Sequence, residues 1–524
     1  MFAKALRLFK DLKKTAFFSH DDRRMLRLLS QKHSCSAGKL KVLIQARPEH
    51  NFIVRILLLL KAWRQGEQGY DIDWAWVLIP FRRNQSLKTY LINEVLKEPL
   101  RRRKWKFFYQ AIGGQFRLSP NELKLSPDDF RHAREICQRF KKPTDLADWK
   151  DEDGQLWGDL VYDTYLRFAR RPTIDLNDEF LVEMMAWTLR LIRAYNLLFE
   201  SRKYESFITL YSAYIHHGIP VRIALARDIP VYVLGAPNQL VGQPKPGYHF
   251  HRRNFHRYHQ WANELNEDDR KEALKIGHMG LQRRFAGEKD SATSYMRDSA
   301  YRANPNYNIH KILGPKNRTT VLLMGHDFFD SPHIYGDMIY PDFYIWMDET
   351  LKTLSETDFE VLVKPHPNAI EGNEKIYSEF EQRFPKAKFL PSQTSNLELV
   401  ERGIDLVLTV YGTIAHELAY LGVRVLCAGD NPHSTFSFCK TTVNEQEYHS
   451  LIRNPEALPL PQAGSDEIAL FYFVHNYRNS KENPRAYSND MQAEDAVHWL
   501  NPDGDDFASK IEIWRESIDS VSSI

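Results

Sequence analysis

The sequence predicts an α/β protein made of two lobes, each containing a parallel, doubly wound sheet. Segments typical of strands and of helices alternate, with short loops, in residues 39–236 and again in residues 318–500. Between them, residues 237–317 are rich in His, Arg and Glu and have a helical pattern. We therefore expect two Rossmann-like lobes joined by a helical connector, with a helical extension at 1–38 and a C-terminal helix at 501–524.

Length and composition are those of a globular protein with several domains. The chain has 524 residues, 43% of them hydrophobic, and a net charge of +3. So small a charge gives no indication of nucleic-acid binding. The four cysteines form no CxxC pair, so we expect neither a disulfide framework nor a zinc site, as in a cytosolic protein. The most apolar run, residues 52–60, is too short to span a membrane.

The N-terminal extension has the pattern of a basic amphipathic helix. Phe2, Leu6, Phe9 and Leu12 are spaced to share one face, and residues 1–33 contain nine Lys or Arg against three Asp. Such a helix either packs on the first lobe or binds reversibly to an anionic membrane. The second alternative would place a cytoplasmic protein peripherally on the inner face of the cytoplasmic membrane.

The first lobe opens with a strand–helix–strand pattern. Residues 39–63 have the pattern of a strand, a loop and a helix, and residues 73–80 that of a second strand. Residues 81–150 are charged and helical, so they are expected to form an insert. Further strands are predicted at 208–211 and 229–235, on either side of a helix.

The second lobe has the more regular pattern. Its strands are predicted at 319–325, 359–367, 387–391, 404–412 and 424–429, with helices between them. In parallel sheets, ligands bind beyond the carboxyl ends of the strands. Polar segments follow three of these strands: HDFFDSPH after Gly325, KPHPN after Val363 and TVYGT after Leu408. We therefore expect these three strand ends to form one ligand site.

The TVYGT segment has the features of a phosphate site. Gly412 permits a tight turn and a close approach of a ligand to the backbone, and Thr413 occupies the expected N-cap of the next helix. The N–H groups of residues 414–416 would then bind a nucleotide phosphate, and Glu417 would accept hydrogen bonds from ribose hydroxyls. The alternative is that Thr413 only caps the helix and Glu417 is favoured by the helix dipole.

The KPHPN segment places a cationic pair at a strand end. Lys364 and His366 alternate there, so we expect them to share a face, and two prolines stiffen the chain. Such a pair suits the phosphate of a leaving group. His366 can donate a hydrogen bond or a proton to that group.

VLVKPHPN, followed by LVLTVYGTIAHELAYLGVRVL, resembles the GT-B-type transferases of bacterial capsule and lipopolysaccharide assembly. That group includes the Kdo-transferase-like capsule proteins and the bacterial sialyltransferases, and the resemblance covers roughly residues 320–440. It implies that His366 and Pro367 form the HP motif that holds the donor phosphate. It also implies that Gly412 and Thr413 fill the role of the downstream hydroxyl motif.

The resemblance further implies an activity. A sugar would move from a nucleotide-activated donor to a growing bacterial surface polysaccharide or a lipid-linked glycan. The nucleotide sugar is a substrate, so no cofactor is expected, and usually no metal is needed. Thr409, Tyr411 and Thr413 stand where many relatives have serines, and we include Thr409 among the donor-binding residues.

The first lobe is then expected to bind the acceptor and to supply a catalytic carboxylate. Glu49 and His50 follow the first strand, whereas Asp163, Tyr165 and Arg167 alternate as on a strand or follow a loop. An inverting enzyme needs a carboxylate to deprotonate the acceptor hydroxyl, and a retaining enzyme can use one as a nucleophile. Glu49 and Asp163 are equal candidates, and the other three residues are expected in the pocket.

HDFFDSPH contains four groups that could bind a divalent ion: His326, Asp327, Asp330 and His333. Their spacing matches no known metal motif, so we expect no metal. We assign Asp327, Asp330 and His333 to the lining of the pocket. The histidines expected on the surface or in the connector are those at positions 216, 217, 250, 251, 256 and 259.

Three other functions are compatible with this fold. A polyol-phosphate transferase of teichoic-acid type would use the same site with a nucleotide-polyol donor. A nucleotide-sugar epimerase would need acidic groups around one bound sugar and no acceptor. A non-catalytic assembly partner would bind no nucleotide.

Overall fold

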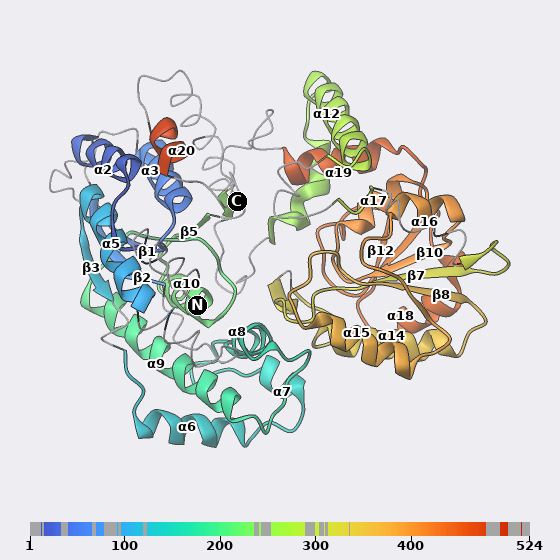
Figure 1. Cartoon of the computed structure of the whole chain (residues 1–524), viewed down its shortest axis with the longest axis horizontal. Helices are drawn as coiled ribbons and strands as arrows, with labels where there is room; N and C mark the ends of the chain where they lie inside the picture. Colours follow the sequence, from blue (N-terminus) through green and yellow to red (C-terminus); the bar gives the residue numbers. More distant parts are fainter. Residues whose placement is uncertain are drawn as a thin grey trace, which may run out of the picture. The chain divides into compact units, whose positions relative to one another are not determined.

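The computed structural model divides the chain into two compact units (Figure 1). Unit 1 comprises residues 1–139, 179–251 and 484–524, and unit 2 comprises residues 140–178 and 252–483. The residues that the structure describes are 12, 15–32, 40–64, 70–77, 92, 96–118, 123–234, 240–242, 253–288, 299–302, 309, 313–334, 336–477, 493–500 and 515. Each unit contains a six-stranded sheet covered by helices, so the predicted pair of Rossmann-like lobes is confirmed.

The sheet of unit 1 has the strand order β3-β2-β1-β4-β5-β6. Its strands are β1 (Leu40–Ala46), β2 (Tyr70–Trp76), β3 (Gln115–Leu118), β4 (Ser206–Thr209), β5 (Val231–Leu234) and β6 (Leu240–Gly242). Strands β1 to β5 pair in parallel, and β6 is antiparallel to β5. The described helices are α2 (His20–Lys32), α3 (His50–Arg64), α5 (Glu98–Ile112), α6 (Pro127–Cys137), α9 (Glu179–Ser201), α10 (Ile215–Leu225) and α20 (Ala493–Trp499).

One strand of unit 1 begins earlier than predicted. The strand expected at 73–80 is β2, which begins at Tyr70. Asp73, inside this strand, is a buried carboxylate that forms ion pairs with Arg117 and Arg202. The strand order of the sheet reverses between β1 and β4.

The sheet of unit 2 has the order β12-β11-β10-β7-β8-β9, and all its pairs are parallel. Its strands are β7 (Thr320–Met324), β8 (Glu360–Lys364), β9 (Lys388–Phe389), β10 (Leu406–Thr409), β11 (Arg424–Cys427) and β12 (Lys440–Thr441). The described α-helices are α7 (Pro143–Ala147), α8 (Gly158–Tyr165), α11 (Tyr258–Asn263), α12 (Glu267–Phe285), α14 (Phe343–Ser355), α15 (Asn373–Arg383), α16 (Asn396–Arg402), α17 (Ile414–Tyr420), α18 (Glu445–Arg453) and α19 (Asp466–Asn476). The order of this sheet reverses between β7 and β10.

The boundaries of the units differ from the predicted domains in three places. Residues 140–178, expected in the lobe 39–236, belong to unit 2, where α8 packs against the short 3₁₀ helix η6 (Pro332–Ile334). Of the connector expected at 237–317, strand β6 belongs to unit 1, whereas the described residues from 253 onward belong to unit 2, where α12 packs along α19. Helix α20, expected in the lobe 318–500, packs against α2 and α3 of unit 1.

The ends of the chain are described only in part. Helix α2, in the predicted extension 1–38, packs against α5 and α20. Residues 1–11 and nearly all of the predicted C-terminal helix 501–524 lie outside the described residues. Membrane binding by the extension therefore stays a prediction. Among the described helices, none is long and apolar enough to cross a membrane.

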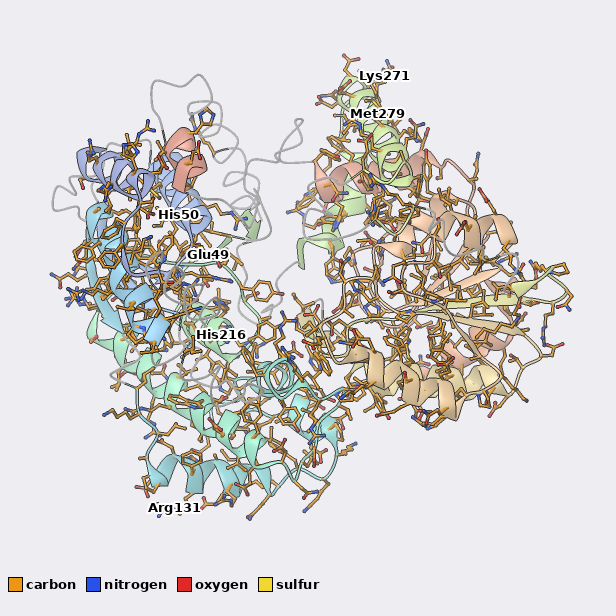
Figure 2. The ribbon with its side chains drawn as sticks, in the orientation of Figure 1. Glu49, His50, Arg131, His216, Lys271 and Met279 are labelled. Atoms are coloured by element: carbon orange, nitrogen blue, oxygen red, sulfur yellow. The ribbon has the colours of Figure 1, made fainter. Side chains whose placement is uncertain are left out.

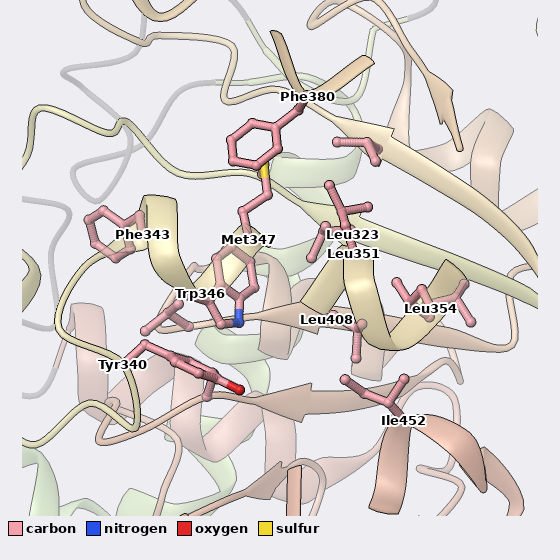
Figure 3. Packing of buried hydrophobic residues seen from close by; sticks show 14 of the residues in the cluster. Leu323, Tyr340, Phe343, Trp346, Met347, Leu351, Leu354, Phe380, Leu408 and Ile452 are labelled. Atoms are coloured by element: carbon pink, nitrogen blue, oxygen red, sulfur yellow. The ribbon is translucent and has the colours of Figure 1, made fainter. Parts of the chain in front are cut away.

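The core of unit 2 holds α14 against the sheet (Figure 3). Trp346 and Met347 of α14 are fully buried with Leu323 of β7 and Leu408 of β10. Burying each such side chain stabilises the fold by about 1.5–3 kcal/mol. The Trp346 indole N–H donates to the Tyr448 hydroxyl at 2.9 Å. This packing fixes the strands whose carboxyl ends form the candidate site.

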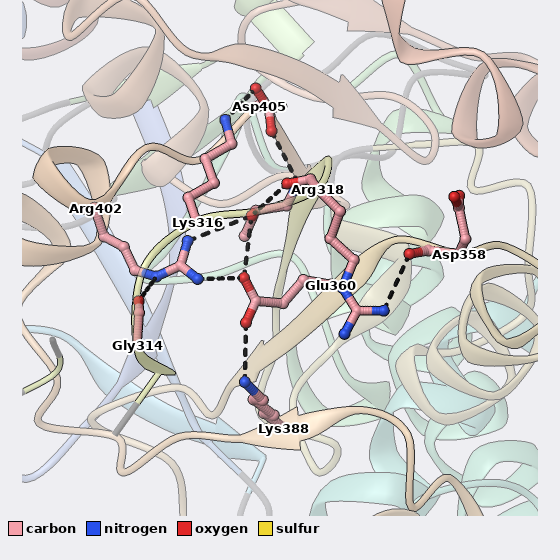
Figure 4. A network of polar contacts seen from close by, with 9 residues as sticks. Gly314, Lys316, Arg318, Asp358, Glu360, Lys388, Arg402 and Asp405 are labelled. Atoms are coloured by element: carbon pink, nitrogen blue, oxygen red, sulfur yellow. Dashed lines mark hydrogen bonds and ion pairs between the residues drawn. The ribbon is translucent and has the colours of Figure 1, made fainter. Parts of the chain in front are cut away.

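The amino end of the same sheet is held by charges (Figure 4). Glu360, the first residue of β8, is paired with Arg402 of α16 at 2.5 Å and with Lys388 of β9 at 2.9 Å. Arg402 also donates to the carbonyl of Gly314 at 3.2 Å. Because Glu360 begins β8, this network lies at the opposite end of the strand from the candidate site and has a structural role.

Candidate functional site

The three strand ends predicted to form one site belong to neighbouring strands. Strand β7 lies between β8 and β10, and the order of the sheet reverses between β7 and β10. In open α/β sheets, ligands bind beyond the carboxyl ends of the strands where the order reverses. The adjacency predicted for HDFFDSPH, KPHPN and TVYGT is therefore confirmed.

At the reversal point, His326 and Thr409 hold the backbone of the turn. The backbone N–H of Val410 donates to Nε2 of His326 at 3.1 Å, and the N–H of Gly412 donates to Oγ1 of Thr409 at 3.3 Å. The His326 ring stacks on Phe343, and burial lowers its pKa to about 3, so the ring is neutral. Thr409 is also buried, which contradicts its predicted role in binding the donor. Its hydroxyl instead helps to shape the turn.

The turn after β10 differs in detail from the predicted phosphate site. Thr413 occupies the N-cap position of α17, but its side chain makes no capping hydrogen bond. Of the N–H groups predicted to face a phosphate, that of Ala415 is bonded to the carbonyl of Gly412 at 3.0 Å. A Cβ at Gly412 would lie 3.0 Å from Oγ1 of Thr409, so a larger residue here would have to displace the Thr409 side chain slightly.

Glu417 is wrongly predicted as a ribose ligand. Its side chain is buried, Oε1 accepts from Nε of Arg284 at 2.9 Å, and Oε2 accepts from the Tyr301 hydroxyl. Both carboxylate oxygens are therefore engaged within the protein. A buried carboxylate needs such partners, and the connector segment that supplies them was not expected in this unit.

Lys364 belongs to the same buried network. Its ammonium group donates to Oδ1 of Asn396, and the side chain is fully buried. Burial lowers the pKa of Lys364 to about 7, although the nearby Glu417 carboxylate favours its charged form. The expectation that Lys364 and His366 together face a phosphate is therefore wrong, because Lys364 points into the interior.

His366 lies just beyond β8, in the turn with Pro367, and both residues are partly exposed. Its Nδ1 accepts the N–H of Asn368 at 3.2 Å, so the neutral ring carries its proton on Nε2. Burial lowers the pKa of His366, against the opposing effect of Asp327 and Asp330. The ring can therefore donate a hydrogen bond through Nε2.

Asp327 has a structural role that the sequence did not predict. Its carboxylate accepts from the N–H groups of Phe329 and Ile370 and from the amide of Asn373, at 2.8–2.9 Å. It thereby joins the loop after β7 to the loop after β8. Asp330 follows in the same loop, where its N–H donates to the carbonyl of Asp327 at 3.1 Å.

The strongest chemical feature of unit 2 is a buried pair formed by Asp163 and His333. Oδ1 of Asp163 lies 2.6 Å from Nδ1 of His333, and the side chains are 3% and 15% exposed. Asp163 is on α8 and His333 on η6, so the predicted strand or loop around Asp163 is wrong. All residues of α8 are buried, which explains the apolar pattern that suggested a strand.

Further acidic groups surround this pair. Burial favours the neutral ring of His333, but Asp163, together with Asp159 and Asp342, raises its pKa above the ordinary value. Burial raises the pKa of Asp163 to about 6, although His333 favours its charged form. Asp342 caps α14 and accepts from the Tyr162 hydroxyl at 2.6 Å. The pair thus combines an oriented imidazole with carboxylates that stabilise its protonated form.

Contacts connect this pair to the reversal point of the sheet. The Tyr411 hydroxyl, in the turn after β10, donates to the carbonyl of Ser331 at 3.1 Å, two residues before His333. Phe343, which stacks on His326, directly follows Asp342. Nε2 of His333 makes no hydrogen bond to another residue in the described part of the chain. This nitrogen is therefore the atom that could exchange a proton with a substrate.

Tyr165 and Arg167 are wrongly predicted as pocket residues beside Asp163. Tyr165 is buried, and its hydroxyl donates to Asp178 at 3.0 Å. Arg167 is exposed in the π-helical turn Leu166–Arg170 that follows α8. On a helix, unlike a strand, residues two positions apart point in different directions.

Glu49 and His50 lie in unit 1, at the end of β1 (Figure 2). Glu49 is paired with Arg47 at 2.8 Å and is partly exposed. His50 is the first residue of α3; its Nε2 lies 3.1 Å from Asp22 of α2, and its ring packs edge-on against Trp105. His50 therefore holds helices together, which contradicts its predicted place in a pocket.

The reversal point of unit 1 contains a polar cluster that sequence reasoning missed. Oε1 of Gln45, in β1, lies 2.7 Å from Oγ1 of Thr209 and 2.8 Å from Nδ1 of His217. Its Nε2 donates to the carbonyl of His216 at 2.8 Å and to Tyr195 at 3.1 Å. Both histidines were expected at the surface and are buried. Their place at the start of the helix predicted after the strand 208–211 was the available signal.

Comparison with known proteins finds similarity in structure only. The sequence matches no protein-family profile and no curated protein. Among solved structures, Thermosulfurimonas dismutans KpsC, a beta Kdo 2,4 transferase, is 14% identical with a TM-score of 0.30, covering 52% of this chain and 79% of its own. Neisseria meningitidis UDP-GlcNAc 2-epimerase is 10% identical with a TM-score of 0.24, and the match covers 83% of this chain and 99% of the epimerase. The spinosyn rhamnosyltransferase SpnG is 11% identical with a TM-score of 0.23, and the match covers 93% of this chain and 100% of SpnG. These similarities are too low to assign a function.

Proposed function

We propose that this protein is a glycosyltransferase that moves a sugar from a nucleotide-activated donor to a glycan or lipid-linked acceptor of a bacterial surface polysaccharide. The observation that carries the proposal is the Asp163–His333 pair beside the point where the strand order of unit 2 reverses. In this proposal the imidazole, oriented by a carboxylate, acts as a base next to the part of the fold where ligands bind in open α/β sheets.

In the proposed reaction, Nε2 of His333 takes the proton of an acceptor hydroxyl. The acceptor oxygen attacks the anomeric carbon of the donor as the bond from that carbon to the phosphate oxygen breaks, which inverts the anomeric centre. Asp163 holds Nδ1–H and stabilises the imidazolium that forms. His366 donates a hydrogen bond from Nε2 to the departing phosphate, in place of a metal ion.

A thermal-shift screen of CMP, CDP, UDP and GDP first identifies the nucleotide of the donor. Variants of His333 and Asp163 then test the role of the pair in catalysis. His333→Ala should lower kcat about 10²–10⁴-fold, the usual contribution of a general base. Asp466→Asn is the matched control, because Asp466 forms a pair with His278 at 2.9 Å that is more exposed. A folded His333→Ala protein with activity within a few-fold of wild type would remove the pair from the mechanism.

The pH profile gives a second, independent readout. A base works when unprotonated, so kcat/KM should rise as pH passes through the pKa of His333, which lies above its ordinary value. Asp163→Asn removes the carboxylate that contributes most to raising this pKa. The acidic limb should therefore move to lower pH while the plateau rate falls. An unmoved limb would mean that another group is the base.

The same assays separate the alternatives. A glycosyltransferase consumes donor only with acceptor present, apart from slow hydrolysis. Conversion of the donor sugar to an epimer without acceptor would favour the epimerase. Transfer of a polyol phosphate would favour the teichoic-acid-type enzyme, and the absence of nucleotide binding would favour a non-catalytic partner.

A further inference from the structure

Three buried side chains with metal-binding atoms meet at the carboxyl end of β11, away from the Asp163–His333 pair in the sequence. Cys427 is the last residue of β11, Cys439 immediately precedes β12, and His433 lies in the loop between these strands. Their ligand atoms all lie within 4.8 Å of one another, and the three residues are 0%, 6% and 1% exposed. Neighbouring members of this group are six positions apart in the sequence, so a search for CxxC motifs does not find them.

The imidazole of His433 is oriented by Asn431. The Asn431 amide nitrogen donates to the carbonyl of Gly429 and to Oγ1 of Thr441, both at 2.9 Å, which fixes the direction of the side chain. Its Oδ1 accepts the backbone N–H of His433 at 2.8 Å and lies 3.1 Å from Nδ1 of the ring. Nδ1 therefore carries the proton, and Nε2 carries a lone pair. A metal-binding histidine is characteristically held in this way.

A second histidine stands beside this lone pair. Nδ1 of His416, on α17, lies 2.9 Å from Nε2 of His433 and donates its N–H to that lone pair, so an ion bound by Nε2 would replace this hydrogen bond. His416 is also buried. Phe471 packs against both rings, with centroid distances of 5.0 and 4.7 Å. All the side chains of this group are thus shielded from solvent, as the ligands of closed structural metal sites are.

We propose that Cys427, His433 and Cys439 bind a thiophilic divalent ion such as Zn²⁺ as a structural site. Two sulfurs and an imidazole nitrogen are the ligands that Zn²⁺ prefers, and His416 is the nearest group that could complete a tetrahedral set. Two thiol protons leave to solvent as the two metal–sulfur bonds form, so no oxidant or reductant is needed. The site is independent of the proposed transferase chemistry.

Such an ion would stabilise a loop next to the candidate donor site. Cys427 is paired in register with Thr409 of β10, and the N–H of Ala428 donates to the carbonyl of Thr409 at 3.0 Å. The ion would join the end of β11 to the start of β12 and to the loop 428–439. Its removal should therefore loosen this edge of unit 2 without touching Asp163 or His333.

Metal content of the full chain, purified under reducing conditions without a histidine tag, tests the proposal. Mass spectrometry of the metals should find about one zinc ion per chain, and Cys427→Ser and Cys439→Ser should each lose it. Cys137→Ser is the matched control, because Cys137 is a buried cysteine on α6 of unit 1. This variant should keep the metal.

A second measurement uses the wild-type protein, in case the serine variants do not fold. Replacement of the ion by Co²⁺ should give the thiolate-to-metal absorption and the visible bands of a tetrahedral site. Wild-type protein that contains no metal above background, and shows no such absorption with added Co²⁺, would overturn the proposal. A Cys427–Cys439 disulfide in protein purified under reducing conditions, seen as a mass lower by two hydrogen atoms, would overturn it as well.

Discussion

A substitution at Glu417 tests whether its carboxylate, on the helix after β10, binds a ligand or partners in the protein interior. Glu417→Gln keeps the shape of the side chain but removes its charge. Arg284, which is 2% exposed and donates to Oε1 at 2.9 Å, would then keep a buried positive charge without its partner. Lys364 would lose the nearby carboxylate that favours its charged form. We therefore expect a loss of stability.

The expected loss follows from the burial of both partners. Removing one member of a buried ion pair costs about 3–5 kcal/mol, because the other charge is left uncompensated. In a domain of this size, 1 kcal/mol shifts the melting temperature by about 2–4 °C. The melting temperature of unit 2 should therefore fall by roughly 6–20 °C. Arg284→Met added to Glu417→Gln should recover part of the loss, because it removes the orphan charge.

Differential scanning calorimetry measures the melting temperature, and titration of the same samples with nucleotide measures the affinity. Glu272→Gln is the control, since its carboxylate lies on the same helix as Arg284 and forms a half-exposed pair with Lys275 at 3.7 Å. This variant should change stability by no more than about 0.5 kcal/mol. Suppose instead that Glu417→Gln melts like the control and loses nucleotide affinity. The carboxylate then binds a ligand, and the buried network is not formed.

Two further substitutions test the ends of the sheet of unit 2. In Gly325→Ala, the new Cβ would lie 1.9 Å from the hydroxyl oxygen of the buried Tyr377, so unfolding experiments should show a loss of about 1–3 kcal/mol, which Tyr377→Phe should partly restore. In Glu360→Gln, Arg402 keeps a buried charge without its partner, so stability at neutral pH should fall by about 3–5 kcal/mol. Burial would raise the pKa of Glu360, but Lys388 and Arg402 lower it overall. The stability that the ionised carboxylate contributes is therefore fully present above the ordinary pKa of a glutamate and is lost as the pH falls. The difference between Glu360→Gln and wild type, measured by urea unfolding, should therefore shrink below about pH 4, and a difference that stays constant would contradict this reasoning.

The central strands of both sheets could be predicted because they are parallel and buried on both faces. Strands β3 and β6 were not predicted, because they lie in segments with a helical pattern, and β12 was not predicted because it has only two residues. Such strands appear as short apolar runs, as in VLLM of β7 and LVL of β10. The sequence also placed β7, β8 and β10 in one sheet with polar residues at their ends. These features depend on local pattern and on the rules of parallel sheets, so they required no knowledge of distant contacts.

The roles of individual polar residues could not be predicted in the same way. Lys364 and Glu417 follow strands just as ligand-binding residues do, but both are satisfied by partners distant in the sequence, such as Arg284. Whether a charged group near a strand end faces a ligand or the interior depends on which segments cover it. The cysteines at 427 and 439 are a similar case, because only the fold brings them to His433.

Asp163 shows how one misplaced segment changes the expected mechanism. The sequence placed residues 140–178 in the first lobe, where Asp163 competed equally with Glu49 for the role of catalytic carboxylate. In the structure this segment belongs to unit 2, and Asp163 meets His333, which is 170 positions away in the sequence. A lone carboxylate would itself be the base, whereas in the proposed mechanism a carboxylate bonded to Nδ1 orients the imidazole, and the imidazole is the base. Glu49 forms only a partly exposed ion pair with Arg47 and has no imidazole partner among the described residues. The two candidates are therefore no longer equivalent, and the pH profile of Asp163→Asn is the experiment that separates an oriented imidazole from a carboxylate base.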